Sequence, residues 1–476
     1  MAQAPTEAPA AQGKITSEEL AAKLSELAAE LQVPGVAAGI LLDGEETIAT
    51  YGVTSIENAL AVTEETLFQF GSTGKTFTAT AIMRLVEQGK IDLNAPVRTY
   101  VPELKLKDES VAANVTVLQL LNHSAGWQGD FFEDTGRGTD AIAKYVEKMA
   151  DLEQVTPLGS QASYNNASLV LAGLVIEKVT GKPYEEAVKE LVLDPIGLES
   201  VSADEDQIMC KRFVVGHINR EEKETKTVKS WGLAKSVTPA GGWSSDIRDQ
   251  LKWARFHLGD GTGKDGQTVL SKETLDWMKE PTFSLGGGAI GDFVAISWLI
   301  KDIDGVRLVG HGGTTTGQLS AFQMVPEKGF AVAVLTNSTN GGQLHGKVVE
   351  WALERALGVK KPEDEPLTLT EEELGQYTGE FKSIGSTAFI TIADGKLSVK
   401  VEPDQEMLAK AREKGQVTEE EIAEALKQPP LLLDVLADDK YVIADGRAKG
   451  MRGFFVRDED GKVFGINFGG RLATRI

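Results

Sequence analysis

The stretch Gly71-Ser72-Thr73-Gly74-Lys75, followed by the run TFTATAIMRLV at 76–86, decides how the rest of the sequence is interpreted. Apolar residues recur in this run at helical spacing, at Phe77, Ala81, Ile82, Leu85 and Val86. The run therefore predicts an amphipathic helix with Ser72 at its N-terminal end. A spacing of three residues places Ser72 and Lys75 on one helix face, so the amine can help to remove the hydroxyl proton. The positive end of the helix would favour the oxyanion that follows attack.

The composition excludes several classes of function. The chain has 476 residues, of which 41% are hydrophobic, which is enough for two domains with substantial cores. Lys and Arg total 49 against 71 for Asp and Glu, so the formal net charge is −22. Such a charge argues against nucleic acid or an anionic membrane as a partner. No apolar segment approaches the ~20 residues that a membrane span needs.

Cysteine and histidine are sparse, and the chain begins with a polar segment. Cys210 is the single cysteine and the five histidines lie far apart, so we expect neither a disulfide nor a metal site, and no cofactor. Residues 1–13 are rich in Ala, Pro and Gln and lack the basic and apolar regions of a signal peptide. Two explanations fit: a cytoplasmic protein, or an exported or periplasmic chain that begins after a removed signal.

The order of the elements predicts the fold class of the larger domain. After a flexible lead at 1–15, a helix opens at 16–19, and 35–52 form a hairpin that turns at Asp43-Gly44. A mostly helical region runs from about 92 to 275, and strands return at 294–300, 306–309, 319–325 and 330–335. A helix at 344–357 closes this domain, which spans 16–358. We therefore predict an α/β (α+β) fold, with an antiparallel sheet flanked by helices and an inserted helical lobe.

A second, smaller domain follows the linker at 359–369. Short alternating strands separated by turns predict a small antiparallel β-barrel over 370–476, with strands at 389–392, 397–401, 431–435, 441–443, 453–457 and 463–468. The polar segment 405–427 lies between these strands, and 418–421 would open a short helix there. We interpret this segment as an insertion at the rim of the barrel.

Two other motifs carry chemistry-bearing side chains. Tyr164-Asn165-Asn166 precedes an apolar helix, where a loop can present the phenol and the Asn166 amide to a cleft. Alternatively, the tyrosine is a loop anchor and the asparagine a helix cap. The glycine-rich segment 309–317 contains His311, which can orient a substrate or take part in proton transfer near neutral pH. The alternative there is a glycine-rich turn with a structural histidine.

Taken together, S-x-x-K at Ser72, Y-x-N at Tyr164 and H-x-G at His311 resemble the serine β-lactamase and penicillin-binding-protein superfamily. The resemblance covers about 16–358 and is greatest to class C β-lactamases, D-aminopeptidases and related esterases. It implies that Ser72 forms an acyl-enzyme. It also implies that Lys75 and Tyr164 share the acid and base work, and the sequence leaves open which of them takes the first proton.

The resemblance also assigns the surrounding residues. The backbone N–H groups of Ser72 and of Thr314, which follows Gly313, would form the oxyanion hole, and Asn166 would bond the substrate amide. Tyr164 or His311 would activate the water that releases the acyl group. Loop residues are expected to line the pocket, among them Trp127 and Gln128.

The third motif departs from many β-lactamases, which carry a lysine where this chain has His311. Histidine is largely neutral at pH 7, so a permanent cation for a substrate carboxylate is missing. We therefore expect a small-molecule or peptide substrate that is cleaved at an amide or peptide bond. The alternatives are a carboxylesterase, a weak β-lactamase, and a non-hydrolytic penicillin-binding or sensing protein.

The C-terminal barrel resembles the lipocalin-like domains attached to some D-aminopeptidase-type and archaeal peptidase members of the superfamily. Two roles fit this domain. It could gate the substrate, or it could be a stabilising or oligomerising appendage that makes the protein a homo-oligomer.

Overall fold

The structure, a computed structural model, describes residues 13–219, 224–383, 385–413, 419, 422, 426–446 and 448–476. The chain divides into two compact units. The first comprises Met1–Ser160, Asn165–Thr282 and Ala295–Lys361, and the second comprises Gln161–Tyr164, Phe283–Val294 and Pro362–Ile476. Most of the predicted lead, and the predicted helix start at 418–421 apart from Glu419, lie outside the described residues. The predicted domain limits stay predictions.

The first unit contains most of the helices and the main sheet strands. Its helices are α1 (Ser17–Glu30), α2 (Lys75–Glu87), α3 (Glu109–Asn114), α4 (Val117–Leu121), α5 (Ala141–Lys148), α6 (Asn166–Thr180), α7 (Tyr184–Val188), α8 (Asp194–Ile196), α9 (Glu205–Met209), α10 (Thr238–Gly241), α11 (Ile247–Leu258), α12 (Lys272–Trp277) and α13 (Gly341–Leu357). Its strands are β1 (Gly35–Leu42), β2 (Glu45–Gly52), β3 (Phe68–Gln69), β4 (His217–Ile218), β5 (Lys226–Thr227), β6 (Ser244–Ser245), β9 (Leu299–Ile303), β10 (Val306–Thr314), β11 (Leu319–Val325) and β12 (Phe330–Thr336). None of the helices in the described part of the chain is long and apolar enough to cross a bilayer.

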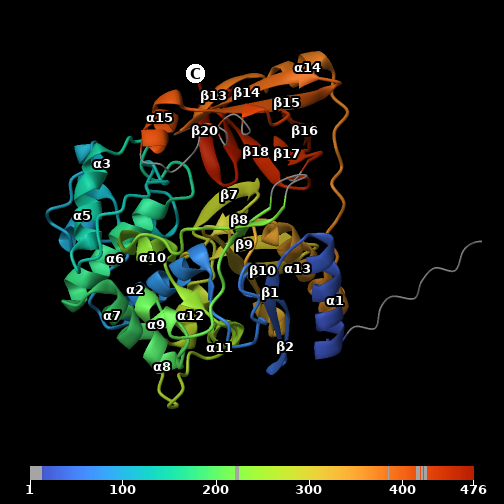
Figure 1. Cartoon of the computed structure of the whole chain (residues 1–476). Helices are drawn as coiled ribbons and strands as arrows, with labels where there is room; N and C mark the ends of the chain where they lie inside the picture. The colour runs from blue at the N-terminus through green and yellow to red at the C-terminus, as the bar shows by residue number, and fades with distance from the viewer. Residues whose placement is uncertain are drawn as a thin grey trace, which may run out of the picture. The chain divides into compact units, whose positions relative to one another are not determined.

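Within the first unit, the antiparallel sheet runs in the order β2-β1-β12-β11-β10-β9. The β1–β2 hairpin and the capping box that opens α1 at Thr16 and Glu19 confirm the predictions for this end of the chain. β1 is buried on both faces: Val36, Ala38 and Ile40 pack with α1 and α13, whereas Ala37 and Leu41 pack with the helical lobe. Figure 1 shows α1 and α13 beside β1. Both faces are covered, and this explains why β1 reads as a continuous apolar run.

In the second half of the sheet, one predicted strand was wrong and another was correct but too short. The strand predicted at 294–300 is interrupted before β9 begins at Leu299, because Ser297 has a φ of +56° that extended backbone does not adopt. The strand predicted at 306–309 continues to Thr314, so the glycine-rich segment is strand and not turn. A Cβ on Gly310 would lie 2.2 Å from the carbonyl oxygen of Phe322, so glycine here permits close backbone approach.

The second unit is built around a closed eight-stranded barrel in the order β13 to β20. Its elements are β7 (Phe283–Gly288), β8 (Gly291–Val294), α14 (Glu371–Gly375), β13 (Gly379–Ser383), β14 (Ser386–Ala393), β15 (Lys396–Pro403), α15 (Gln405–Glu413), β16 (Leu431–Val435), β17 (Lys440–Ile443), β18 (Arg452–Arg457), β19 (Val463–Phe468) and β20 (Arg471–Arg475). The prediction of a C-terminal antiparallel barrel is confirmed. The two strands that close it, β13 and β20, were missed because they are short and largely polar. The segment 283–292 forms most of the β7–β8 hairpin.

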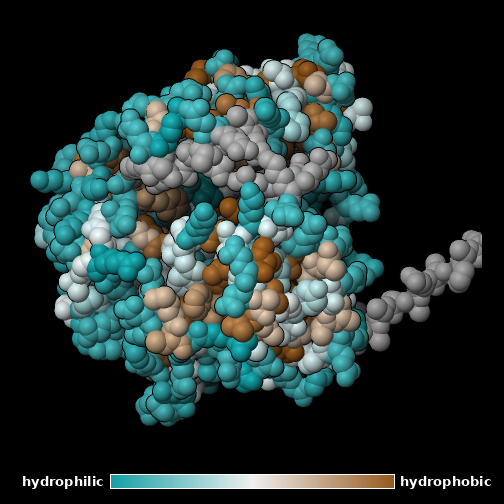
Figure 2. All heavy atoms as spheres, viewed as in Figure 1, coloured by the Kyte–Doolittle hydropathy of each residue, from teal (hydrophilic) through white to brown (hydrophobic). Residues whose placement is uncertain are grey.

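Hydrophilic side chains predominate on the face drawn in Figure 2, and the apolar ones visible there are interspersed among them. This distribution agrees with the formal charge of −22. Such a charge favours solubility and repels anionic surfaces.

Candidate active site

The nucleophile candidate lies on a short 3-10 turn, η1 (Gly71–Gly74), that leads directly into α2. Residues three apart eclipse one another in a 3-10 turn, so Lys75 lies directly over Ser72. The Lys75 Nζ donates to the Ser72 Oγ at 3.0 Å. The predicted pairing of the two side chains is therefore present. The helix itself is less amphipathic than predicted, because every residue from Lys75 to Met83 is buried.

Side-chain hydrogen bonds fasten this turn to the sheet. The Thr73 Oγ1 donates to the carbonyl oxygen of His311 at 3.3 Å and lies 3.0 Å from the Ser320 Oγ. The Ser320 Oγ in turn donates to the carbonyl oxygen of Phe70 at 2.7 Å. The turn that carries Ser72 is thus tied to both β10 and β11.

Glycines allow two other backbone segments to approach the same turn. Gly71 has a φ of +53°, and a Cβ there would lie 2.6 Å from the Thr314 nitrogen. A Cβ on Gly241, at the end of α10, would lie 3.1 Å from the Ser72 nitrogen. The nucleophile turn is therefore packed between the end of β10 and the end of α10, and the backbone N–H of Thr314 lies beside Gly71.

The Lys75 ammonium is fully buried and donates to three acceptors. Besides the Ser72 Oγ, these are the Asn166 Oδ1 and the carbonyl oxygen of Ala240, each at 2.6 Å. An ammonium has three N–H groups, which is enough for one bond to each of these acceptors. The sequence did not identify Ala240 as a partner of Lys75.

Asn166 connects Lys75 to an acidic side chain that sequence reasoning missed. Asn166 is the first residue of α6, is 4% exposed, and follows Asn165, whose side chain caps the helix at the Ser168 N–H. The Asn166 Nδ2 donates to the Asp130 Oδ1 at 2.8 Å. Asp130 belongs to an irregular loop, where no periodicity marks one side chain over its neighbours.

His311 lies on β10 and is 2% exposed, with its Nδ1 2.5 Å from the carbonyl oxygen of Gly312. Burial and the nearby charge of Lys75 lower the pKa of His311 to about 3. The imidazole is therefore uncharged near pH 7. The ordinary pKa of histidine already led us to expect this, and the lowered pKa of His311 extends the uncharged form to lower pH. This favours a hydrogen-bonding role for His311 over proton transfer near pH 7.

Tyr164 immediately precedes Asn165 and belongs to the second unit. It is 6% exposed, and its backbone N–H donates to the carbonyl oxygen of Gly470 at 2.9 Å. The Arg471 guanidinium lies over its ring, 4.7 Å from the centroid, which is cation–π geometry. The sequence motifs did not indicate that Arg471 contacts Tyr164, because Arg471 lies about 300 residues further along the chain.

The remaining candidates are placed as follows. Gly313 is buried against the carbonyl oxygen of Phe70, and Thr314 is exposed at the end of β10. Trp127 is only 2% exposed and belongs to the core of the helical lobe, while its carbonyl oxygen accepts from the Asn165 side chain. Gln128 is half-buried.

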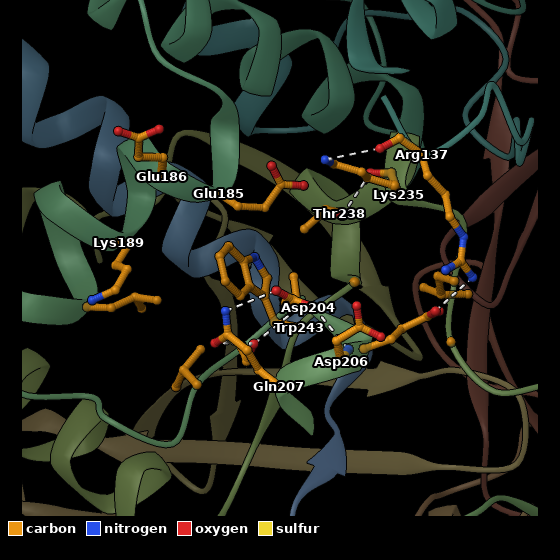
Figure 3. Close-up of a pocket in the computed structure, with 18 of the residues that line it drawn as sticks. Arg137, Glu185, Glu186, Lys189, Asp204, Asp206, Gln207, Lys235, Thr238 and Trp243 are labelled. Atoms are coloured by element: carbon orange, nitrogen blue, oxygen red, sulfur yellow. Dashed lines mark hydrogen bonds and ion pairs between the residues drawn. The ribbon is translucent and has the colours of Figure 1, made fainter. Parts of the chain in front are cut away.

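The first unit also contains a cavity of about 870 Å³ to which neither Ser72 nor Lys75 contributes. Carboxylates outnumber cations in its lining. Figure 3 shows Glu185 and Glu186 on one side and Asp204 and Asp206 on another, near Trp243. Arg137, one of its few cations, is paired with Glu205 at 2.7 Å. The cavity is thus distinct from the nucleophile turn, and its charge disfavours anionic ligands.

The fold and this site define a class of protein. A sequence profile described as Beta-lactamase matches residues 20–356, and the chain belongs to this family. It is accordingly a serine hydrolase of the β-lactamase and penicillin-binding-protein type.

Individual relatives agree with this assignment. Penicillin-binding protein 4 of Amycolatopsis lactamdurans is 32% identical over 342 residues, which cover 71% of this chain and 89% of that protein. A β-lactamase of Providencia stuartii is 28% identical over 244 residues, which cover 51% of this chain and 60% of that protein. The match therefore spans less than two thirds of the Providencia enzyme.

Two solved structures share the fold along almost the whole chain. The crystal structure of SurE has a TM-score of 0.75 at 23% identity and covers 97% of this chain and 99% of its own. The octameric penicillin-binding protein homologue from Pyrococcus abyssi has a TM-score of 0.65 at 24% identity and covers 97% and 100%. The added C-terminal barrel is thus included in the shared fold.

Proposed function

We propose that the protein cleaves an amide or peptide bond through a covalent acyl-enzyme on Ser72. The observation that carries the proposal is the buried Lys75 ammonium, 3.0 Å from the Ser72 Oγ. A cation held at that distance in a buried site stabilises the alkoxide as it forms. Its position is preorganised by Asn166 and Ala240, so it need not move when the reaction begins.

In the proposed reaction, Tyr164 takes part as the phenolate: the Ser72 Oγ attacks the substrate carbonyl carbon while its proton passes to the Tyr164 oxygen, which restores the neutral phenol. In this scheme Lys75 keeps its charge and lies beside the Ser72 oxygen as the alkoxide forms. The N–H groups of Ser72 and Thr314 bond the oxyanion. The bond to the leaving amine then breaks as the amine takes the proton from Tyr164, and water attacks the acyl-enzyme to release the acid.

The neutral side chain of His311 supports a substrate without a required carboxylate next to the scissile bond. With the pKa of His311 at about 3, this position carries no cation at working pH. We therefore propose weak β-lactamase activity and faster turnover of peptides, amides or esters. Efficient cephalosporin hydrolysis at pH 8 would contradict this.

A second candidate is a penicillin-binding protein that is acylated and then stalls. It is favoured by the name of the Amycolatopsis relative, which is 32% identical. Burst kinetics separate the two candidates, because a stalled acyl-enzyme releases one equivalent of chromophore and stops.

The substrate class is tested with a panel of D- and L-amino-acid anilides, short-chain esters and nitrocefin, each run beside Ser72→Ala. We expect sustained turnover of at least one anilide or ester, and none by the variant. Equal rates for the wild type and Ser72→Ala on every substrate would reject the proposal.

We also propose that the protein assembles as a homo-oligomer, a suggestion supported by the octameric homologue from Pyrococcus abyssi. Light scattering coupled to size-exclusion chromatography should give a mass that is a multiple of the chain mass. A monomer at micromolar concentration would contradict this.

A further inference from the structure

The loop between α4 and α5 holds the start of α6, on which Asn166 lies. The carbonyl oxygen of Gly129 accepts from the N–H groups of Asn166 at 3.0 Å and Ala167 at 3.1 Å. The first N–H groups of a helix have no partner inside the helix, so this carbonyl satisfies two of them. The residue after Gly129 is therefore fixed relative to Asn166.

The same loop is fastened on both sides of Asp130. Before it, the carbonyl oxygen of Trp127 accepts from the Asn165 Nδ2 at 2.8 Å. After it, the carbonyl oxygen of Phe131 accepts from the Tyr145 hydroxyl at 2.5 Å, and the two rings lie 5.0 Å apart. Hydrogen bonds therefore hold the backbone on both sides of Asp130, although the Asp130 side chain itself is exposed.

A chain of hydrogen bonds runs from this carboxylate to the nucleophile. The Asp130 Oδ1 accepts from the Asn166 Nδ2 at 2.8 Å, and the Asn166 Oδ1 accepts from the Lys75 Nζ at 2.6 Å. The Lys75 Nζ then donates to the Ser72 Oγ at 3.0 Å. Every link pairs a donor with an acceptor.

The carboxamide of Asn166 has a donor end and an acceptor end, and only one orientation satisfies both neighbours. If the amide were flipped, its NH₂ group would face the Lys75 ammonium and its oxygen would face the Asp130 carboxylate. The first contact would then pair two donors, and the second would pair two acceptors. A carboxylate accepts only, so its presence selects the orientation that offers oxygen to Lys75.

We infer that Asp130 is a positioning residue, which acts through the Asn166 carboxamide to hold the Lys75 ammonium against the Ser72 Oγ. This inference rests on the proposed function of Ser72 and Lys75. Loss of the carboxylate frees the amide to flip and the ammonium to drift. Displacements of this kind in a catalytic group lower rates on the order of 10-fold to 100-fold.

The test compares Asp130→Ala with Asp130→Asn, whose side-chain oxygen can still accept from Asn166. The acylation rate is measured with a fluorophosphonate probe, and kcat and KM with a chromogenic ester. We expect Asp130→Ala to lower the acylation rate and kcat by about 10-fold to 100-fold with little change in KM. Asp130→Asn should recover most of the loss. Glu147→Ala, on the exposed surface of α5, removes the same charge and should leave the rates unchanged.

A double-mutant cycle separates action through Asn166 from a merely structural effect. Adding Asp130→Ala to Asn166→Ala should cause no further loss, because the carboxylate has no carboxamide left to orient. Additive losses, or a wild-type rate for Asp130→Ala, would overturn the inference. If alanine lowers the unfolding midpoint, Asp130→Leu, which fills the space, is put through the same cycle and judged by the same outcomes.

The two levels of the proposal fail in different ways. If Ser72→Ala remains active, the proposed function is wrong. If Ser72→Ala is inactive while Asp130→Ala equals the wild type, only the role of Asp130 is wrong.

Discussion

A methyl group added at Gly71 should separate the nucleophile turn from the end of β10. In Gly71→Ala the new Cβ would lie 2.6 Å from the Thr314 nitrogen and 3.0 Å from its carbonyl oxygen. Ordinary contact begins at about 3.4 Å, so backbone must move by several tenths of an ångström. The φ of +53° adds a left-handed cost of about 1–2 kcal/mol for any residue with a Cβ.

Gly89 is the matched control for this substitution, since it follows α2 with a φ of +67° and nothing lies within 4 Å of its would-be Cβ. Gly89→Ala therefore carries the left-handed cost alone. In urea titrations, we expect both variants to lose unfolding free energy through this left-handed cost. Gly71→Ala should lose more, because its Cβ also overlaps Thr314. Only Gly71→Ala should displace Thr314 from its place beside Ser72.

The catalytic consequence follows from the proposed oxyanion hole. Loss of one backbone donor lowers kcat by about 100-fold to 1,000-fold in enzymes that use such a site. We expect a loss of this order in Gly71→Ala and nearly wild-type kcat in Gly89→Ala, with a chromogenic ester as substrate. Equal kcat for the two variants would refute the role of the Thr314 N–H.

Two other predictions concern acid stability and the barrel unit. Burial lowers the pKa of His345 to about 3, below its value near 6.5 in the unfolded chain. As the pH falls, the unfolded chain therefore binds the proton first. The folded state loses stability between pH 6.5 and about pH 3 for this reason. His345→Gln should reduce the slope of the unfolding free energy against pH by about 1.4 kcal/mol per unit between pH 6 and 4, and an unchanged slope in urea titrations would contradict this. Arg471→Met removes the cation over the Tyr164 ring and should slow fluorophosphonate labelling by roughly 2-fold to 30-fold, while Arg471→Lys keeps part of the rate. Identical rates for both variants and the wild type would show that the guanidinium has no part in the reaction.

Local patterns predicted the elements whose signals lie within a few residues. The capping box at Thr16, the hairpin that turns at Asp43-Gly44 and the Ser72–Lys75 pair all depend on neighbours in sequence. Secondary-structure propensity and residue spacing also act between residues close in sequence, so these features could be predicted without knowledge of tertiary contacts.

The errors occurred where contacts distant in sequence decide the conformation. The predicted strand stopped at Val309 and left a glycine-rich turn open as an alternative, whereas the glycines at 310–313 continue the strand, with the backbone of Phe70 and Phe322 close to Gly313 and Gly310. β13 and β20 carry little hydrophobic alternation and are held by pairing with each other and with β14 and β19. Partners of this kind become visible only after the chain has folded.

The same distinction applies to the site. The sequence named the candidate side chains Ser72, Lys75 and Asn166, and it missed the groups that contact Lys75 and Asn166. Asp130 lies 36 residues from Asn166, and the Ala240 carbonyl lies 165 residues from Lys75. A backbone carbonyl carries no residue-type signal at all, and a single aspartate in a polar loop resembles any solvated residue.

The central claim is that Ser72 carries the acyl group. We would mix the protein with a p-nitrophenyl ester, quench it in acid within the first turnovers, and map the modified peptide by mass spectrometry, with Ser72→Ala in parallel. The account predicts one acyl group on the peptide that contains Ser72, and neither adduct nor turnover in the variant. An acyl group on another residue, or turnover by Ser72→Ala at the wild-type rate, would contradict it.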